Sequence, residues 1–256
     1  MMPYKSLFAF ILVSLTGQAT HAQQVNSNEA YTATKNQLAQ WLHVQKSLAQ
    51  SNDLVSSLTL TDKNNLIVAG EIHYQPSGKQ CIAYAPHRFY DKHTYAIALA
   101  LLGDCQVFLA NTVHRHTSTH DGQKSDLGKY RYSVTNAFIE TYASMVERVM
   151  IYQIHGFDAK KRHTQQARSS DVIISQGSKP ATAQLQRISQ CLTQKLKLTS
   201  RVYPLEVTEL GGTKNILNQI ALKNSEFFHI ELSYTLRTQL VQQPNLMSQF
   251  KTCITL

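Results

Sequence analysis

Several apolar stretches of the sequence stop abruptly at residues that can bind a metal ion or move a proton. They end at His87, His155 and Glu231, which lie far apart along the chain. Imidazole and carboxylate groups bind zinc, and a zinc site with one open position lowers the pKa of water towards neutrality. A separate carboxylate can then take a proton from that water and pass it to a leaving amine. The three residues therefore predict hydrolysis assisted by a zinc ion.

These residues need a scaffold that brings them together, and the pattern of apolar residues predicts one. We expect strands at 66–74, 81–85, 106–111, 150–154, 171–175, 201–203 and 227–232, the first two forming a hairpin around the turn at 76–79. Helices are expected at 28–50, 94–102, 133–146, 181–198, 215–222 and 234–241. This alternation predicts a single α/β domain with a mostly parallel or mixed sheet and helices on both faces. Because ligands bind at the carboxyl ends of parallel strands, His87, His155 and Glu231 would converge there.

Glu231 is the predicted general base. It lies inside the apolar run at 227–232, and burial disfavours the charged form of a carboxylate and so raises its basicity. The alternative is a buried ion pair, for instance with Arg237. His73 and His229 are expected only to face solvent or fill polar gaps.

Two connections are expected to shape the site. Residues 114–132 are rich in His, Ser, Thr, Asp and Gly and predict a long loop beside the pocket. Gly211 and Gly212 predict a tight loop with glycine at positive φ, which would also border the pocket.

Three segments of the chain resemble those of the phage-type poly-γ-glutamate hydrolases, which are zinc amidohydrolases with a fold like that of the zinc carboxypeptidases. Residues 85–94 (APHRFYDKHT) resemble the stretch with their first metal ligands, and residues 154–156 resemble the strand end with their last histidine ligand. Residues 230–237 resemble the stretch that carries their general-base glutamate. The resemblance runs from about residue 68 to 241, and the N-formylglutamate amidohydrolases share the same plan.

The resemblance implies a zinc-carboxypeptidase-like fold in which His87, Asp91 and His155 hold Zn²⁺ and Glu231 is the base. The acidic ligand of these families is usually Glu at a different distance from its histidine, whereas this chain has the spacing H-x-x-x-D. An Asp just before a helix is also a common N-cap. The residues that could replace Asp91 as a ligand are His93, His114 and His116.

The resemblance also implies that Arg115 binds a carboxylate of the substrate, with Arg162 and Arg237 as further candidates. A guanidinium group suits this role because its N–H groups fork onto both carboxylate oxygens. The alternative for Arg115 is an ion pair with Asp126 or Asp121 in the 114–132 loop.

The N-terminus has the pattern of an export signal. Lys5 precedes the apolar stretch Leu7–Leu15, and small residues then lead to an expected cleavage point after Ala22. Residues 1–22 would be the signal and residues 23–256 the mature domain, located in the periplasm or outside the cell.

The cysteines agree with an oxidising compartment, because their number is even. Cys81 and Cys105 each open a strand-like run and would meet if those strands are parallel neighbours. Cys253 lies near the end of the chain, where a bond to Cys191 would hold a fraying tail. We therefore expect the pairs Cys81–Cys105 and Cys191–Cys253; four buried thiols are the alternative.

The composition narrows the function classes. The 256 residues include 25 Lys and Arg against 16 Asp and Glu, a net charge of +9, which favours a small anionic or peptide-like substrate. The sequence has no GxSxG motif and no Rossmann glycine fingerprint, which argues against a serine α/β-hydrolase and a nicotinamide enzyme. Nothing marks a nucleic-acid-binding module, and no apolar run is long enough to keep the mature chain in a membrane.

Two hypotheses of different kinds follow. The first is an exported zinc-dependent hydrolase that cleaves an amide bond next to a carboxylate in an acyl-amino acid, a γ-glutamyl peptide or a cell-wall peptide. The second is a periplasmic or secreted protein that binds an anionic ligand in the same crevice without catalysis, or a family member that has lost turnover.

Overall fold

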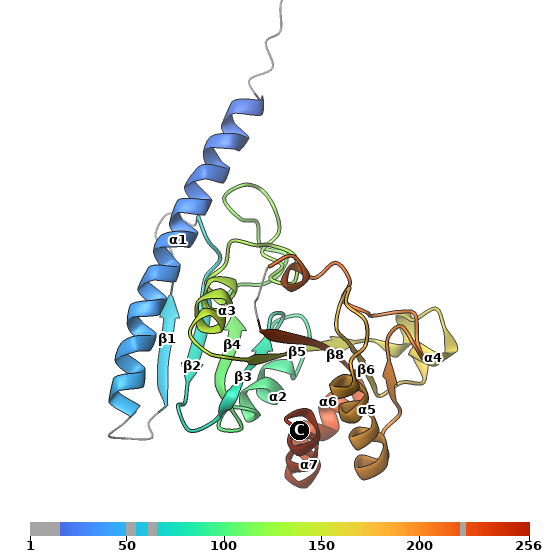
Figure 1. The fold of residues 1–256 in the computed structure, drawn as a ribbon. Coiled ribbons are helices and arrows are strands. Elements are labelled where there is room, and N and C mark those ends of the chain that lie inside the picture. The colour runs from blue at the N-terminus through green and yellow to red at the C-terminus, as the bar shows by residue number, and fades with distance from the viewer. Residues whose placement is uncertain (1–15, 50–54, 61–65, 221–223) are drawn as a thin grey trace, which may run out of the picture.

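One mixed β-sheet organises the computed structural model, which describes residues 16–49, 55–60, 66–220 and 224–256 (Figure 1). Its strands lie in the order β1-β2-β4-β3-β5-β8-β6-β7. Their bounds are β1 Ser56–Leu60, β2 Gly70–Tyr74, β3 Lys79–Ala85, β4 Cys105–Asn111, β5 Val149–Phe157, β6 Val172–Ser175, β7 Ser200–Val202 and β8 Ser225–Ser233. Strands β4, β3, β5 and β8 are parallel, whereas β2 is antiparallel to both of its neighbours and β6 is antiparallel to β8.

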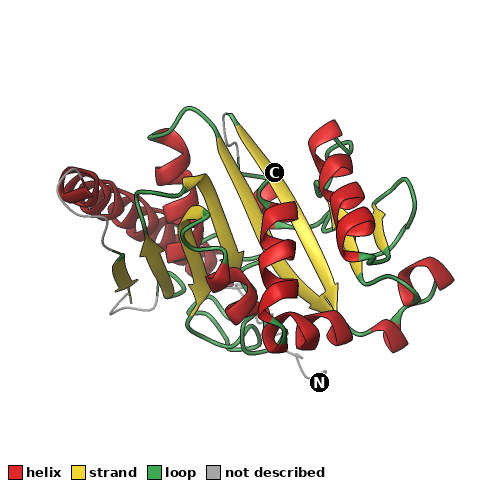
Figure 2. Ribbon diagram, turned by 90° about the horizontal axis from the view of Figure 1, so that it is seen from below, coloured by secondary structure: helices red, strands yellow, loops and turns green. Residues whose placement is uncertain are grey.

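Helices cover both faces of this sheet (Figure 2). The helices on one face are α1 (Thr16–Ala49) and α3 (Val134–Ser144). Those on the other are α2 (Thr94–Ala100), α5 (Ala183–Leu196), α6 (Tyr234–Gln242) and α7 (Pro244–Ile254). The connections add a short helix, α4 (Gln165–Arg168), and the 3-10 turns η1 (Ala159–Lys161) and η2 (Ile216–Asn218). The predicted α/β class, with a mixed sheet and helices on both faces, is confirmed.

Strand β3 shows why these residues form a central strand. Successive side chains of a strand face opposite sides, so Ile82 and Tyr84 join the core beneath α1 and α3, while Ala83 and Ala85 face α2. A strand covered on both faces is apolar at nearly every position, which is the pattern of buried parallel sheets.

The predicted hairpin of 66–74 with 81–85 is wrong. The segment at 70–74 pairs with β1 and β4, and β4 lies between it and β3. The turn residues at 76–79 do reverse the chain, but β4 separates the two strands, because it pairs in antiparallel with β2 and in parallel with β3. Strand β1 and helices α4 and α7 were not predicted from the sequence, and of the predicted helix at 215–222 the described residues form only η2.

Both predicted disulfides are present. Cys81 and Cys105 lie at the same end of the neighbouring parallel strands β3 and β4, with a Cα–Cα distance of 4.8 Å. The bond between Cys191 in α5 and Cys253 in α7 ties the C-terminal helix to the rest of the layer on its face of the sheet.

The stretch Leu7–Leu15 lies outside the described residues, so the export signal stays a prediction. Ala22, the expected cleavage point, lies within α1. Among the helices in the described part of the chain, none has both the length and the apolar character needed to cross a membrane.

Candidate metal centre

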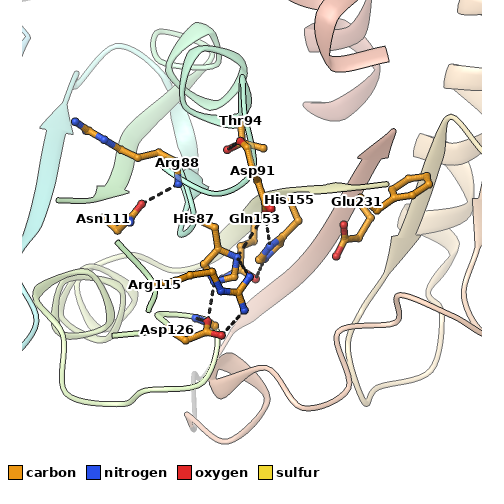
Figure 3. A network of polar contacts seen from close by, with 12 residues as sticks. His87, Arg88, Asp91, Thr94, Asn111, Arg115, Asp126, Gln153, His155 and Glu231 are labelled. Carbon is orange, nitrogen blue, oxygen red and sulfur yellow. Dashed lines mark hydrogen bonds and ion pairs between the residues drawn. The ribbon is translucent and has the colours of Figure 1, made fainter. Parts of the chain in front are cut away.

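His87, Asp91 and His155 come together in the interior, each no more than 5% exposed. One ligand atom from each lies within 4.8 Å of the others. Asp91 Oδ2 is 3.5 Å from His87 Nδ1 and 3.5 Å from His155 Nδ1 (Figure 3). Zinc with bonds of about 2.0–2.1 Å in tetrahedral geometry holds its ligand atoms roughly 3.4 Å apart. The two distances to Asp91 match this spacing, and the types of the three donors fit a divalent metal ion.

A tight turn after β3 presents the first two of these residues. The backbone N–H groups of Tyr90 and Asp91 both donate to the carbonyl of His87, at 2.8 Å, so the side chains at 87 and 91 fall on the same side of the turn. Thr94 donates its backbone N–H and its hydroxyl to the carbonyl of Asp91. The N-cap of α2 is His93 and not Asp91, which leaves the Asp91 carboxylate available to the site.

The second nitrogen of each imidazole is held by an oxygen. His87 Nε2 lies 2.7 Å from Asp126 Oδ1, and His155 Nε2 lies 2.9 Å from Gln153 Oε1. Gln153 Oε1 also accepts a hydrogen bond from Asn215 Nδ2, which fixes the orientation of the amide. An acceptor at Nε2 keeps the proton there and leaves the Nδ1 lone pair directed at the cluster, the arrangement usual for metal-binding histidines.

The protonation states of the cluster also suit a cation. Burial and the nearby His229 lower the pKa of His155 to about 4, so its ring is neutral at neutral pH. Burial raises the pKa of Asp91, but His155 and His87 outweigh it and hold that pKa well below its usual range. Burial lowers the pKa of His87, but Asp126 and Asp91 outweigh burial and raise that pKa, so protons compete with a metal ion for this ring more than for a free imidazole.

Glu231 lies beside this cluster because of strand pairing. In the parallel pair β5 and β8, Gln153 is opposite His229 and His155 is opposite Glu231. Residues directly opposite in parallel strands point to the same face, as do residues two apart in one strand. The four polar side chains therefore lie together near the carboxyl ends of β5 and β8, on the face of the sheet that α1 and α3 cover.

Only one of the two carboxylate oxygens of Glu231 has a hydrogen-bond partner. Oε1 is 3.2 Å from His229 Nε2, while Oε2 is buried and has no hydrogen-bond partner. The expectation that burial makes Glu231 more basic is wrong. Burial does raise its pKa, but the hydrogen bond and charge of His229 and the charge of His155 outweigh burial and lower it. Glu231 is therefore ionised at neutral pH, and its partner is His229 and not Arg237.

Three polar residues around the cluster were missed in the sequence as parts of a site: Asp126, Gln153 and His229. His229 is buried, and its ring centroid is 4.4 Å from that of His155. The pattern Gln153-Ile154-His155 and its counterpart in β8, polar at both ends and apolar between, was the available signal, because it marks one polar face on each strand. The alternative ligands His93, His114 and His116 are not part of the three-residue cluster.

The predicted substrate-binding arginines have partners within the protein. Arg115 forms an ion pair with Asp126, the alternative considered from the sequence, and its Nη1 lies 3.2 Å from His87 Nδ1. Arg162 lies 3.7 Å from Glu209. Arg237 is buried and donates to three backbone carbonyls. Substrate binding by these residues stays a prediction.

A crevice of about 180 Å³ opens beside the cluster. Its lining includes His87, His229 and Glu231, and three cationic side chains, Arg115, Lys129 and Lys214. The 114–132 loop forms one wall, as expected, and Gly212, with φ of 60°, belongs to the other. Three exposed aromatic side chains lie close to site residues in the sequence. Phe89 and Tyr90 lie between His87 and Asp91, and Tyr234 comes three residues after Glu231.

No protein-family model and no curated protein matches this chain. Among solved structures it is similar to a protein assigned as a carboxypeptidase A from Shewanella denitrificans, with a TM-score of 0.47, 12% identity, and coverage of 82% of this chain and 66% of that chain. It is also similar to N-formylglutamate amidohydrolase from Ralstonia eutropha (TM-score 0.43, 10% identity, coverage of 80% and 96%). A third is a metallo-carboxypeptidase from Pseudomonas aeruginosa (TM-score 0.42, 12% identity, coverage of 73% and 60%).

This chain thus spans 66% and 60% of the length of those two carboxypeptidase structures. The function proposed below rests on this chain's own side chains.

Proposed function

We propose that this protein is an exported zinc-dependent hydrolase that cleaves an amide bond next to a carboxylate. His87, Asp91 and His155 would hold the metal, and Glu231 would be the general base. The observation that carries the proposal is the convergence of two imidazoles and a carboxylate within 4.8 Å, with Glu231 opposite His155 on the adjacent strand.

Zinc is the metal that best suits this donor set, because two neutral imidazoles and one carboxylate are a common catalytic zinc set that leaves a position open. A zinc ion bound there would polarise the carbonyl of the scissile amide and lower the pKa of water. The oxygens of Asp126 and Gln153 would keep both rings turned towards the ion.

Glu231 is equipped to move the proton. His229 holds Oε1, and the free Oε2 can accept a proton from the attacking water and later deliver it to the leaving nitrogen. Because Glu231 is ionised at neutral pH, no other group has to deprotonate it first.

The charge of the crevice supports an anionic substrate. Arg115 is already paired with Asp126, whereas Lys129 and Lys214 are exposed and have no ion-pair partner among the described residues. Two free ammonium groups at the mouth of a site would attract a carboxylate on the substrate.

The experiment is a hydrolysis screen of the purified protein, with acyl-amino acids, γ-glutamyl peptides and muropeptides, before and after removal and return of Zn²⁺. The proposal expects cleavage of a member of this set that stops on chelation and returns with zinc. If the protein binds such compounds without cleaving them in the presence of zinc, it is a binding protein for an anionic ligand and the proposed reaction is wrong.

A further inference from the structure

Arg237 links three separate segments of the site. It lies one turn into α6, is 5% exposed, and directs its guanidinium group back towards the strand ends. Nε donates to the carbonyl of Leu232 at 3.2 Å, Nη2 to that of Phe157 at 3.4 Å, and Nη1 to that of Lys92.

These carbonyls belong to the backbone next to site residues. Leu232 follows Glu231, Lys92 follows Asp91, and Phe157 comes two residues after His155. Strand pairing already joins the ends of β5 and β8, but the turn that carries Asp91 belongs to neither strand. One planar side chain therefore joins the turn to both strand ends.

Gly156 makes room for this arrangement. A Cβ atom at position 156 would lie 2.3 Å from Cζ of Arg237, so any side chain there would displace the guanidinium group. The glycine between His155 and Phe157 is thus explained by the close approach of Arg237, an observation independent of the hydrogen bonds.

We propose that Arg237 is a positioning residue of the metal centre, which sets the spacing of Asp91, His155 and Glu231 and does not contact the substrate. The inference rests on the proposed metal site. A guanidinium group can serve three carbonyls at once because its donors diverge in one plane, whereas the ammonium group of Lys is a compact charge that cannot span them.

If Arg237 acted only through its positive charge, removing it would have the opposite effect on metal affinity. Arg237 is a buried cation near Asp91 and Glu231, so its positive charge by itself opposes the binding of another cation. If Arg237 acted only through its charge, Arg237→Met would tighten metal binding. If it positions the ligands, both Arg237→Met and the charge-retaining Arg237→Lys weaken binding.

The test is a Zn²⁺ titration of the full metal-free chain against a chromophoric chelator, together with the visible absorption of bound Co²⁺. For Arg237→Lys and Arg237→Met we expect an increase in Kd of about 10- to 100-fold, the range typical of groups that orient metal ligands, and an altered Co²⁺ band. Gly156→Ala should act in the same direction. It keeps Arg237, and its backbone lies outside the left-handed region, so this variant also covers the case in which the arginine variants do not fold.

Two controls separate positioning from general destabilisation. Arg201→Lys also removes a guanidinium contact with a backbone carbonyl, that of Gln166 at 3.2 Å, but away from the metal centre. Ile188→Val trims the core beneath α5. Both should bind Zn²⁺ as the wild type does, whatever their melting temperatures.

Wild-type affinity in Arg237→Lys and Gly156→Ala, or tighter binding in Arg237→Met, would overturn this inference while leaving the proposed function intact. A wild-type chain that binds no zinc would instead contradict the proposed function, and the inference with it.

Discussion

His155 and Glu231 lie directly opposite one another on the neighbouring parallel strands β5 and β8. The distance between the predicted metal ligand and the predicted base is therefore set by sheet pairing and not by loops. Sites built on paired strands are held more rigidly than sites on loops, because the backbone hydrogen bonds of the sheet fix the positions of both residues.

Replacing the base should separate catalysis from metal binding. Glu231→Gln keeps the size of the side chain but removes the proton acceptor, so we expect kcat to fall by about 10²- to 10⁴-fold while Kd for Zn²⁺ stays close to the wild-type value. Steady-state kinetics and the chelator titration measure the two quantities. Glu226→Gln is the matched control, since Glu226 lies in the same strand at the opposite end and pairs with Arg148. Unchanged kcat in Glu231→Gln would remove Glu231 from the mechanism.

Asp126, which accepts the hydrogen bond from Nε2 of His87, should contribute to metal affinity almost as strongly as a ligand does. Asp126→Asn removes the charge that holds Nε2 of His87, and we expect the affinity for Zn²⁺ to fall by about 10- to 100-fold. Asp121→Asn, in the same loop, should have no effect on metal binding because Asp121 contacts Thr119, Gln123 and Tyr130 and not the cluster. Equal affinity in the two variants would show that Asp126 does not orient His87.

The disulfides should stabilise the fold to different degrees. In the chain-entropy account a crosslink that closes a longer loop stabilises more, and the two sequence separations are 24 residues for Cys81–Cys105 and 62 for Cys191–Cys253. We expect losses of about 3 and about 4 kcal/mol in the free energy of unfolding when each pair is replaced by Ser. Urea unfolding measures both; a larger loss for the Cys81–Cys105 pair would contradict the loop-length account.

The carboxylate of Glu209, whose side chain is only 15% exposed, should make the stability of the protein sensitive to acid. Burial raises its pKa, but hydrogen bonds from Thr164 and His163 and the charge of Arg162 together outweigh burial and lower that pKa from 4.5 to about 2. A pKa that is lower in the folded state means that the contribution to stability is complete above pH 4.5 and is lost as the pH falls towards 2.

The matching variant is Glu209→Gln. We expect it to be less stable than the wild type at pH 7 and to approach the wild type between pH 4.5 and 2, as followed by urea unfolding. Other acidic groups titrate in both proteins and cancel in the difference. A difference that does not change with pH would show that the Glu209 contacts do not favour its ionised form.

The sequence predicted most elements of the sheet and both disulfides, because long apolar runs and their polar ends are local signals. The predicted pairing of β2 with β3 was wrong, because a turn sequence such as that at 76–79 reverses the chain whether or not the flanking strands pair with each other. Only the pairing of β4 with both β2 and β3, which involves residues more than 20 positions further along the chain, places β4 between them.

The residues that surround the cluster were harder to predict for a similar reason. His229 and Gln153 acquire a role only through the register of β5 with β8, and Asp126 only through the path of a long loop. The pKa of Glu231 was misjudged because burial was considered without the imidazole of His229, whose effect exceeds that of burial.

The proposed metal site is tested by the zinc content of the purified protein after exposure to Zn²⁺ and removal of the excess, measured by elemental analysis. We expect one zinc ion per wild-type chain and none in His155→Ala, with Ile188→Val as the folded control that retains the metal. A wild-type chain without stoichiometric zinc, or a His155→Ala variant that keeps it, would show that His87, Asp91 and His155 do not form a zinc site.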